Sequence, residues 1–169
     1  MVESLEPYSI AQWNTLLAVQ ASAAATLTGL VFVAVSINLN RIMAFPGLPG
    51  RAGESILEFL NVFFVSIVAL VPQQPAKLLA IEILLIGLTS WIAQMLVQRR
   101  YLRVRTGHPW SWFIYRAVLT QLATLPFCVA AILLLLGISG GIYWLVPGFI
   151  FSFVAGLVGA WVLLVEVVR

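Results

Sequence analysis

The sequence predicts an all-α integral membrane protein, a bundle of about five transmembrane helices. Hydrophobic residues make up 62% of the 169 residues and charged residues only 9%, whereas soluble domains are about 25% charged. Five apolar runs follow one another, each close to the roughly 20 residues that cross a bilayer. No repeated apolar and polar alternation indicates a transmembrane barrel, so helices are the expected way to satisfy the backbone in lipid.

The predicted spans lie at residues 13–39, 55–71, 76–97, 112–136 and 142–168. Segments rich in proline, glycine or arginine separate them. One separator, Pro72-Gln73-Gln74-Pro75, is so short that the helices before and after it must form an antiparallel hairpin. The remaining segments leave no room for an extramembrane domain, so residues 1–169 are predicted to form a single transmembrane domain.

Basic residues predict the orientation, because Lys and Arg in short loops stay on the cytoplasmic side. With the N-terminus outside and the C-terminus cytoplasmic, eight of the nine basic residues fall inside and only Lys77 falls outside. The eight are Arg41, Arg51, Arg99, Arg100, Arg103, Arg105, Arg116 and Arg169. The expected location is the plasma (inner) membrane of a bacterium.

Small and hydroxyl-bearing residues recur at helical spacing in the first and fifth spans. In the first span they include Ser22, Thr26, Gly29, Ser36 and Asn40, and in the fifth Ser152, Gly156 and Ala160. Membrane helices associate through such residues, because small side chains allow close approach of the backbones. Two interpretations follow: packing within one bundle, or a first helix that lines a narrow aqueous path at the axis of a homo-oligomer.

Carboxylates within spans are costly, so each is a candidate for function. Glu54 and Glu58 lie one turn apart at the predicted start of the second helix. Glu54 at that terminus has a sufficient structural explanation. Glu58 lies deeper and is predicted either to form a salt bridge, with Arg116 among the candidate partners, or to bind ions. Glu82 is isolated and needs a partner from another helix, water or a proton.

The basic third loop offers a second kind of contact. Arg99, Arg100, Arg103 and Arg105 could bind anionic lipid headgroups, or they could serve only to set the topology. Nucleic-acid binding is not indicated, because the net charge is only +3 and the basic residues lie at membrane boundaries.

Catalytic and metal-binding patterns are missing from the sequence. The single histidine, His108, lies beside Pro109, and the single cysteine, Cys128, has no evident activating base. No metalloprotease, serine-hydrolase, phosphate-loop or dinucleotide motif occurs. We therefore expect no enzyme activity, no cofactor and no metal.

The predicted function is an oligomeric pore or channel for ions or small solutes. Its candidate pore-lining or ion-binding residues are Ser22, Thr26, Ser36, Asn40, Glu58 and Glu82. The alternative is a non-catalytic accessory or regulatory subunit that uses its small faces to dock on a larger membrane complex or protease. The sequence leaves both open, and in either case the partners are the lipid bilayer and other membrane-embedded chains.

Overall fold

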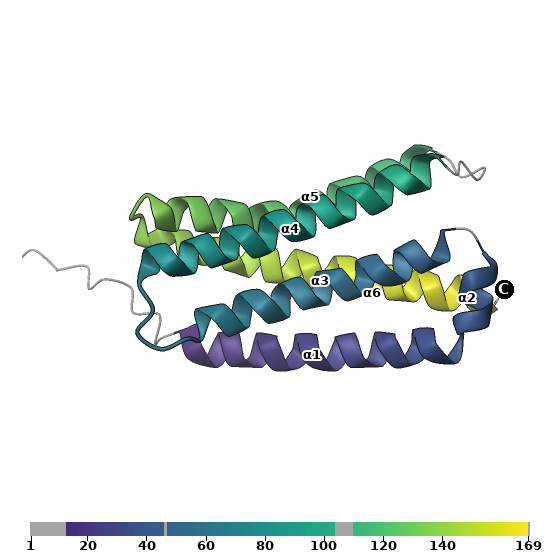
Figure 1. Ribbon diagram of the computed structural model, residues 1–169, viewed down its shortest axis with the longest axis horizontal. Coiled ribbons are helices and arrows are strands. Elements are labelled where there is room, and N and C mark those ends of the chain that lie inside the picture. The colour runs from purple at the N-terminus through teal and green to yellow at the C-terminus, as the bar shows by residue number, and fades with distance from the viewer. Residues whose placement is uncertain (1–12, 46, 104–109, 169) are drawn as a thin grey trace, which may run out of the picture.

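The computed structural model describes residues 13–45, 47–103 and 110–168, and nearly all of them are helical (Figure 1). The elements in chain order are α1 (Asn14–Ile37), α2 (Leu39–Ala44), α3 (Leu48–Ala69), α4 (Ala76–Arg103), α5 (Trp110–Leu135), the 3₁₀ helix η2 (Ser139–Trp144) and α6 (Leu145–Val168). Five segments are long and apolar enough to cross a membrane: Asn14–Ile37, Leu48–Ala69, Ala76–Arg100, Phe113–Leu135 and Gly140–Val165. The predicted helical class and the five predicted spans are confirmed.

The predicted span boundaries lie within three residues of those in the structure, except at the start of the second span. The second span begins at Leu48 instead of residue 55, because Pro49 lies in the first turn of α3, where its missing N–H would be unpaired in any case. Gly47 precedes it at φ 99°, a left-handed conformation that suits glycine. The first predicted span is interrupted at Asn38, where α1 ends and the short α2 begins. Because α3 begins at Leu48, Glu54 lies in its second turn and not at its start.

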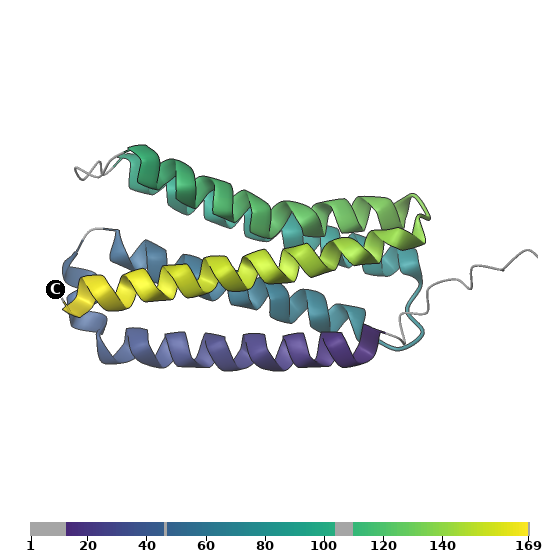
Figure 2. The same cartoon turned by 180° about the vertical axis from the view of Figure 1, so that it is seen from behind.

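The helices form three layers, which are visible from both sides (Figures 1 and 2). α4 and α5 form one outer layer, α3 and α6 the middle, and α1 the other outer layer. α3 packs against α1, α4 and α6, whereas α1 lies almost entirely on α3 and barely reaches α6. The helices α3 to α6 therefore form the bundle proper, with α1 attached along one side.

Glycines allow α6 to approach its neighbours closely. A methyl group on Gly156 would lie 2.5 Å from the ring of Phe59 in α3, and one on Gly148 would lie 2.8 Å from the ring of Phe127 in α5. Both rings are fully buried. The spacing of small residues in the fifth span therefore places α6 directly against aromatic side chains of two other helices.

The interior differs between the two ends of the bundle. Near the α3–α4 connection and η2 it is an apolar core that includes Trp13, Val65, Ile83, Phe127 and Phe149. Toward the N-terminal half of α3 the interior is rich in buried polar side chains. This second end, where α3 and α5 begin and α4 and α6 end, is named the arginine end after Arg41, Arg51, Arg99, Arg100 and Arg116.

Candidate functional site

One face of α3 carries a row of buried polar side chains. Arg51, Ser55, Glu58, Asn61 and Ser66 are each at most 7% exposed. They follow one another at intervals of three to five residues, which places them on one side of the helix. From Arg51 to Ser66 the row extends about 22 Å at roughly 1.5 Å per residue. An interior row of this length covers most of the bilayer thickness.

Other helices add polar side chains against this row. Gln94 and Gln98 of α4, Thr120 and Thr124 of α5, and Ser152 of α6 are all buried. The Ser90 hydroxyl donates a hydrogen bond to Asn61 Oδ1 at 3.3 Å, and Gln98 Nε2 donates one to Thr120 Oγ1 at 3.0 Å. We name the row on α3 together with Ser90 and these five residues the polar core.

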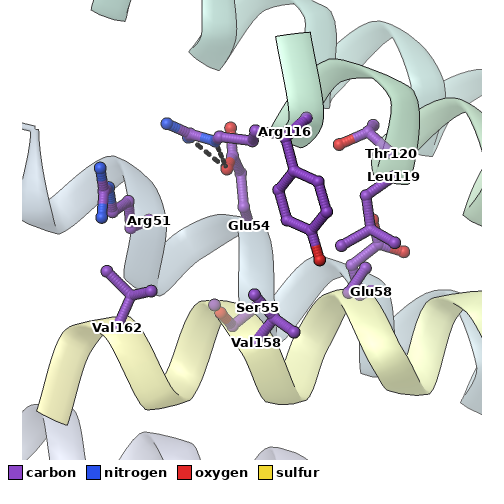
Figure 3. A pocket seen from close by; sticks show the side chains of 12 residues that line it. Arg51, Glu54, Ser55, Glu58, Arg116, Leu119, Thr120, Val158 and Val162 are labelled. Atoms are coloured by element: carbon purple, nitrogen blue, oxygen red, sulfur yellow. Dashed lines mark hydrogen bonds and ion pairs between the residues drawn. The ribbon is translucent and has the colours of Figure 1, made fainter. Parts of the chain in front are cut away.

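A charged pair closes the polar core toward the arginine end. Arg116 of α5 forms an ion pair with Glu54 of α3, with Nε donating to Oε2 at 2.7 Å and a second guanidinium nitrogen contacting the same oxygen (Figure 3). The two side chains are only 12% and 13% exposed. Arg51 contributes a further attractive charge to Glu54. One carboxylate is therefore attracted to two guanidinium groups.

A cavity of about 50 Å³ connects the charged pair with Glu58. It is lined by α3, α5 and α6, and its polar lining consists mainly of Arg51, Glu54, Glu58, Arg116 and Thr120. Figure 3 shows Glu54 and Arg116 joined at the centre, with Arg51 to one side and Glu58 to the other. Most of the accessible lining of this cavity is apolar, and with these polar side chains at its wall it has room for a few water molecules.

Glu58 is the most deeply placed carboxylate of this group. Glu58 is 3% exposed, and Ser152 of α6 and Gln94 of α4 are the polar neighbours of its carboxylate. These contacts are loose: Glu58 Oε2 and both terminal atoms of Gln94 lack a partner of good hydrogen-bond geometry among the described residues. Ser152 instead donates to the carbonyl of Ala123 at 3.4 Å.

Further buried atoms along α3 are also left without partners. Within the described part of the chain these are Glu54 Oε1, Ser55 Oγ, Asn61 Nδ2 and Ser66 Oγ. Buried polar groups are nearly always hydrogen-bonded, to water where no protein group is available. The polar core therefore offers a sequence of acceptors and donors suited to water molecules or a small hydrated cation. Among the described residues, no group of three or more metal-binding side chains occurs.

The predicted face of α1 lies away from this site. Ser22, Thr26, Gly29, Ser36 and Asn40 are all exposed, and a methyl group on Gly29 would meet nothing within 4 Å. The three hydroxyl groups donate to the carbonyls of Ala18, Ser22 and Phe32, one turn back in their own helix. The interpretation that this face packs within the bundle is wrong, because Leu17, Ala21 and Ala24 form the buried face instead.

The two carboxylates predicted to bind ions, Glu58 and Glu82, lie in different parts of the bundle. Arg116 pairs with Glu54, and no salt bridge to Glu58 is found within the described residues. Glu82 lies near the opposite end, where its Oε2 accepts a hydrogen bond from Nε2 of Gln74 in the α3–α4 connection. Glu58 and Glu82 therefore do not share a site.

The remaining predicted residues have varied positions. Ser152 and Gly156 are buried and Ala160 is half-buried. Arg99 and Arg100 are exposed near the end of α4, and Arg103 is its last residue. Arg105 and Arg169 lie outside the described residues.

Sequence reasoning missed the contribution of α4. Ser90, Gln94 and Gln98 recur at intervals of four in an apolar span. This spacing places them on one helical face and could have identified the second wall of the polar core.

Comparison with known proteins finds no matching protein-family model, no matching curated protein and no matching solved structure. The functional argument therefore depends on the residues and geometry described above.

Proposed function

We propose that the protein passes protons or other small cations through the polar core of each protomer. The observation that carries this proposal is Glu58, a buried carboxylate that lines a small internal cavity and has one oxygen without a hydrogen-bond partner among the described residues. Intramembrane ionisable residues are expensive and mark ion pathways in many membrane proteins. The pathway proposed here differs from an axial pore lined by α1, because the α1 hydroxyl groups are already bonded to their own backbone.

The apolar core supports a closed conformation in this proposal. Toward the end of the bundle opposite the arginine end, the interior includes the apolar side chains of Val65, Ile83, Phe127 and Phe149, all at most 1% exposed. Apolar constrictions can close a pathway by excluding water. Passage of a cation would require the packing of this apolar core to loosen. Pro126 lies inside α5, next to Phe127 of the core, and removes one backbone hydrogen bond of that helix.

The orientation and assembly belong to the same proposal. We propose that the N-terminus lies outside and the arginine end faces the cytoplasm, in agreement with the positive-inside rule. A bacterial inner membrane and a homo-oligomer remain parts of the proposal, the latter supported by the exposed small face of α1. No enzymatic role, cofactor or nucleic-acid partner is proposed.

The direct test of the proposed function is cation flux into proteoliposomes, measured with a pH-sensitive dye for protons and isotope uptake for sodium and potassium. We expect Glu58→Gln to reduce the flux of the transported cation by about tenfold or more, equivalent to losing roughly 1.4 kcal/mol of stabilisation of the moving charge. Glu82→Gln is the matched control, because Glu82 lies outside the polar core beside Gln74, and it should leave the flux unchanged. Equal flux through Glu58→Gln and wild-type protein would remove Glu58 from the pathway.

A non-conducting accessory subunit is the second candidate, and the exposed small face of α1 favours it, because this face has no partner among the described helices. We expect Gly29→Leu to abolish association through α1, because a larger side chain prevents close backbone approach. Gly53→Leu is the control, since a methyl group there also meets nothing within 4 Å. Crosslinking in native membranes is the measurement.

The outcome for Gly29→Leu distinguishes the two roles. Loss of self-association supports the homo-oligomer. Loss of a larger complex with self-association intact supports the accessory subunit. If both substitutions leave all crosslinks unchanged, the α1 face contacts only lipid.

A further inference from the structure

A lateral groove separates α1 from α6. The two helices both pack on α3 but barely touch each other, and the space between them is a groove of about 200 Å³. Phe59 of α3 forms part of its lining, while Val31 and Ala34 of α1 and Ala160 and Leu163 of α6 contribute to its sides. This groove is distinct from the polar cavity, which lies between α3, α5 and α6.

The groove is suited to hydrocarbon. All its lining residues are apolar except Asn38, and the Asn38 amide already donates to the carbonyl of Ala34 at 3.0 Å. The groove therefore has few free hydrogen-bonding groups for a polar solute. An unfilled groove would also forfeit the dispersion contacts of its lining atoms. In a bilayer, lipid acyl chains are present at this depth to supply those contacts.

The length of the groove matches one leaflet. On α1 its lining extends from Leu27 to Asn38, which is about 16 Å at roughly 1.5 Å per residue. The hydrocarbon core of a bilayer is about 30 Å thick, so this distance is close to half of it. The groove reaches the arginine end, where Ile42 of α2 also lines it.

The charge at this end favours an anionic headgroup. Arg41 is exposed on α2, directly beside the groove residue Ile42 in the chain. Arg99 and Arg100 are exposed at the same end of the bundle but on α4, in the outer layer opposite α1, and among the described side chains no exposed carboxylate lies at this end. Basic residues at a membrane surface attract anionic lipids. A hydrophobic groove of leaflet length with a cationic mouth matches an amphiphile of opposite headgroup charge.

We propose that the groove between α1 and α6 binds an acyl chain of an anionic phospholipid from the leaflet at the arginine end, with its headgroup beside Arg41. This site is independent of ion passage through the polar core. A second copy of the chain and a free fatty acid are competing occupants, and the experiment below separates them from the phospholipid.

The test is native mass spectrometry of the full chain, released from nanodiscs that contain phosphatidylcholine and phosphatidylglycerol. We expect each wild-type protomer to retain a phospholipid that Ala160→Phe loses, because the larger side chain fills the groove. Ala25→Phe is the matched control on the exposed side of α1 and should retain the lipid. Arg41→Gln should keep the lipid but lower its preference for phosphatidylglycerol by about fivefold.

Several results would overturn the proposal. Retention of the same number of phospholipids by Ala160→Phe and wild-type protein would exclude an acyl chain from the groove. Loss of a dimer without loss of lipid would assign the groove to a second copy, and retained fatty acid in place of phospholipid would also contradict the proposal. An unchanged lipid preference in Arg41→Gln would refute the headgroup contact. Should Ala160→Phe fail to fold, Ala34→Phe fills the groove from the opposite side.

Discussion

Glu54→Gln is expected to destabilise the folded bundle by about 3 kcal/mol, because breaking a buried ion pair leaves its partner charge without compensation. The side chains of Glu54 and Arg116 are both largely buried, and Arg51 lies near the same carboxylate. Removing the negative charge therefore leaves two guanidinium groups close together. Arg116→Gln should be milder, because Glu54 keeps the attractive charge of Arg51.

The measurement is unfolding of the purified protein in mild detergent, with the three proteins compared at equal ionic strength. The double substitution Glu54→Leu with Arg116→Leu is the informative control, because replacing both charges with apolar groups is often close to neutral. It should recover most of the lost stability. Equal stability of Glu54→Gln and wild-type protein would show that the pair contributes little.

Gly156→Leu is expected to separate α6 from α3 and to destabilise the bundle by about 3 kcal/mol, the upper part of the range for overpacked interiors. A methyl group at this position already meets the ring of the fully buried Phe59, so a leucine requires the ring or α6 itself to shift. The expected result is a lower midpoint of unfolding and a loss of tertiary contacts detected by crosslinking between α3 and α6.

Gly53→Leu is the matched control for this substitution as well. It lies on α3, a methyl group there meets nothing within 4 Å, and leucine has the higher helix propensity. Its stability should equal or slightly exceed that of the wild-type protein. If Gly156→Leu behaves like Gly53→Leu, the close approach of α6 to Phe59 is not important for stability.

The sequence predicted the number and approximate position of the spans, because long apolar runs have few alternatives in a bilayer. It placed the start of α3 too late, since proline and glycine at residues 46–50 resemble a loop although Pro49 is compatible with a first helical turn. The same error placed Glu54 at a helix terminus. The sequence placed Glu58 one turn deeper than Glu54, but a salt bridge of Glu58, one of the two predicted alternatives, is not found within the described residues.

The contacts of α1 could not be predicted in the same way. Ala21 and Ala24 face α3, whereas Ser22 and Thr26, one and two residues further along the sequence, are exposed. Both faces consist of small residues, and the hydroxyl groups satisfy their hydrogen bonds within α1, so composition does not distinguish them. The contribution of α4 to the polar core was visible in the sequence only as the four-residue interval between Gln94 and Gln98. That interval indicates a polar face, but its partner is known only once the buried polar row of α3 is known.

The division of the interior into a polar and an apolar part affects how a membrane potential is distributed across the bundle. A membrane potential falls mainly across the least polarisable layer, and here that layer is the apolar core around Phe127 and Phe149. If cations follow the pathway that we propose, a cation that reaches Glu58 from the arginine end crosses only a small part of the field, and the full field amounts to about 2.3 kcal/mol per charge at 100 mV. Occupancy of Glu58 should depend weakly on voltage, whereas movement through the apolar core should depend on it strongly.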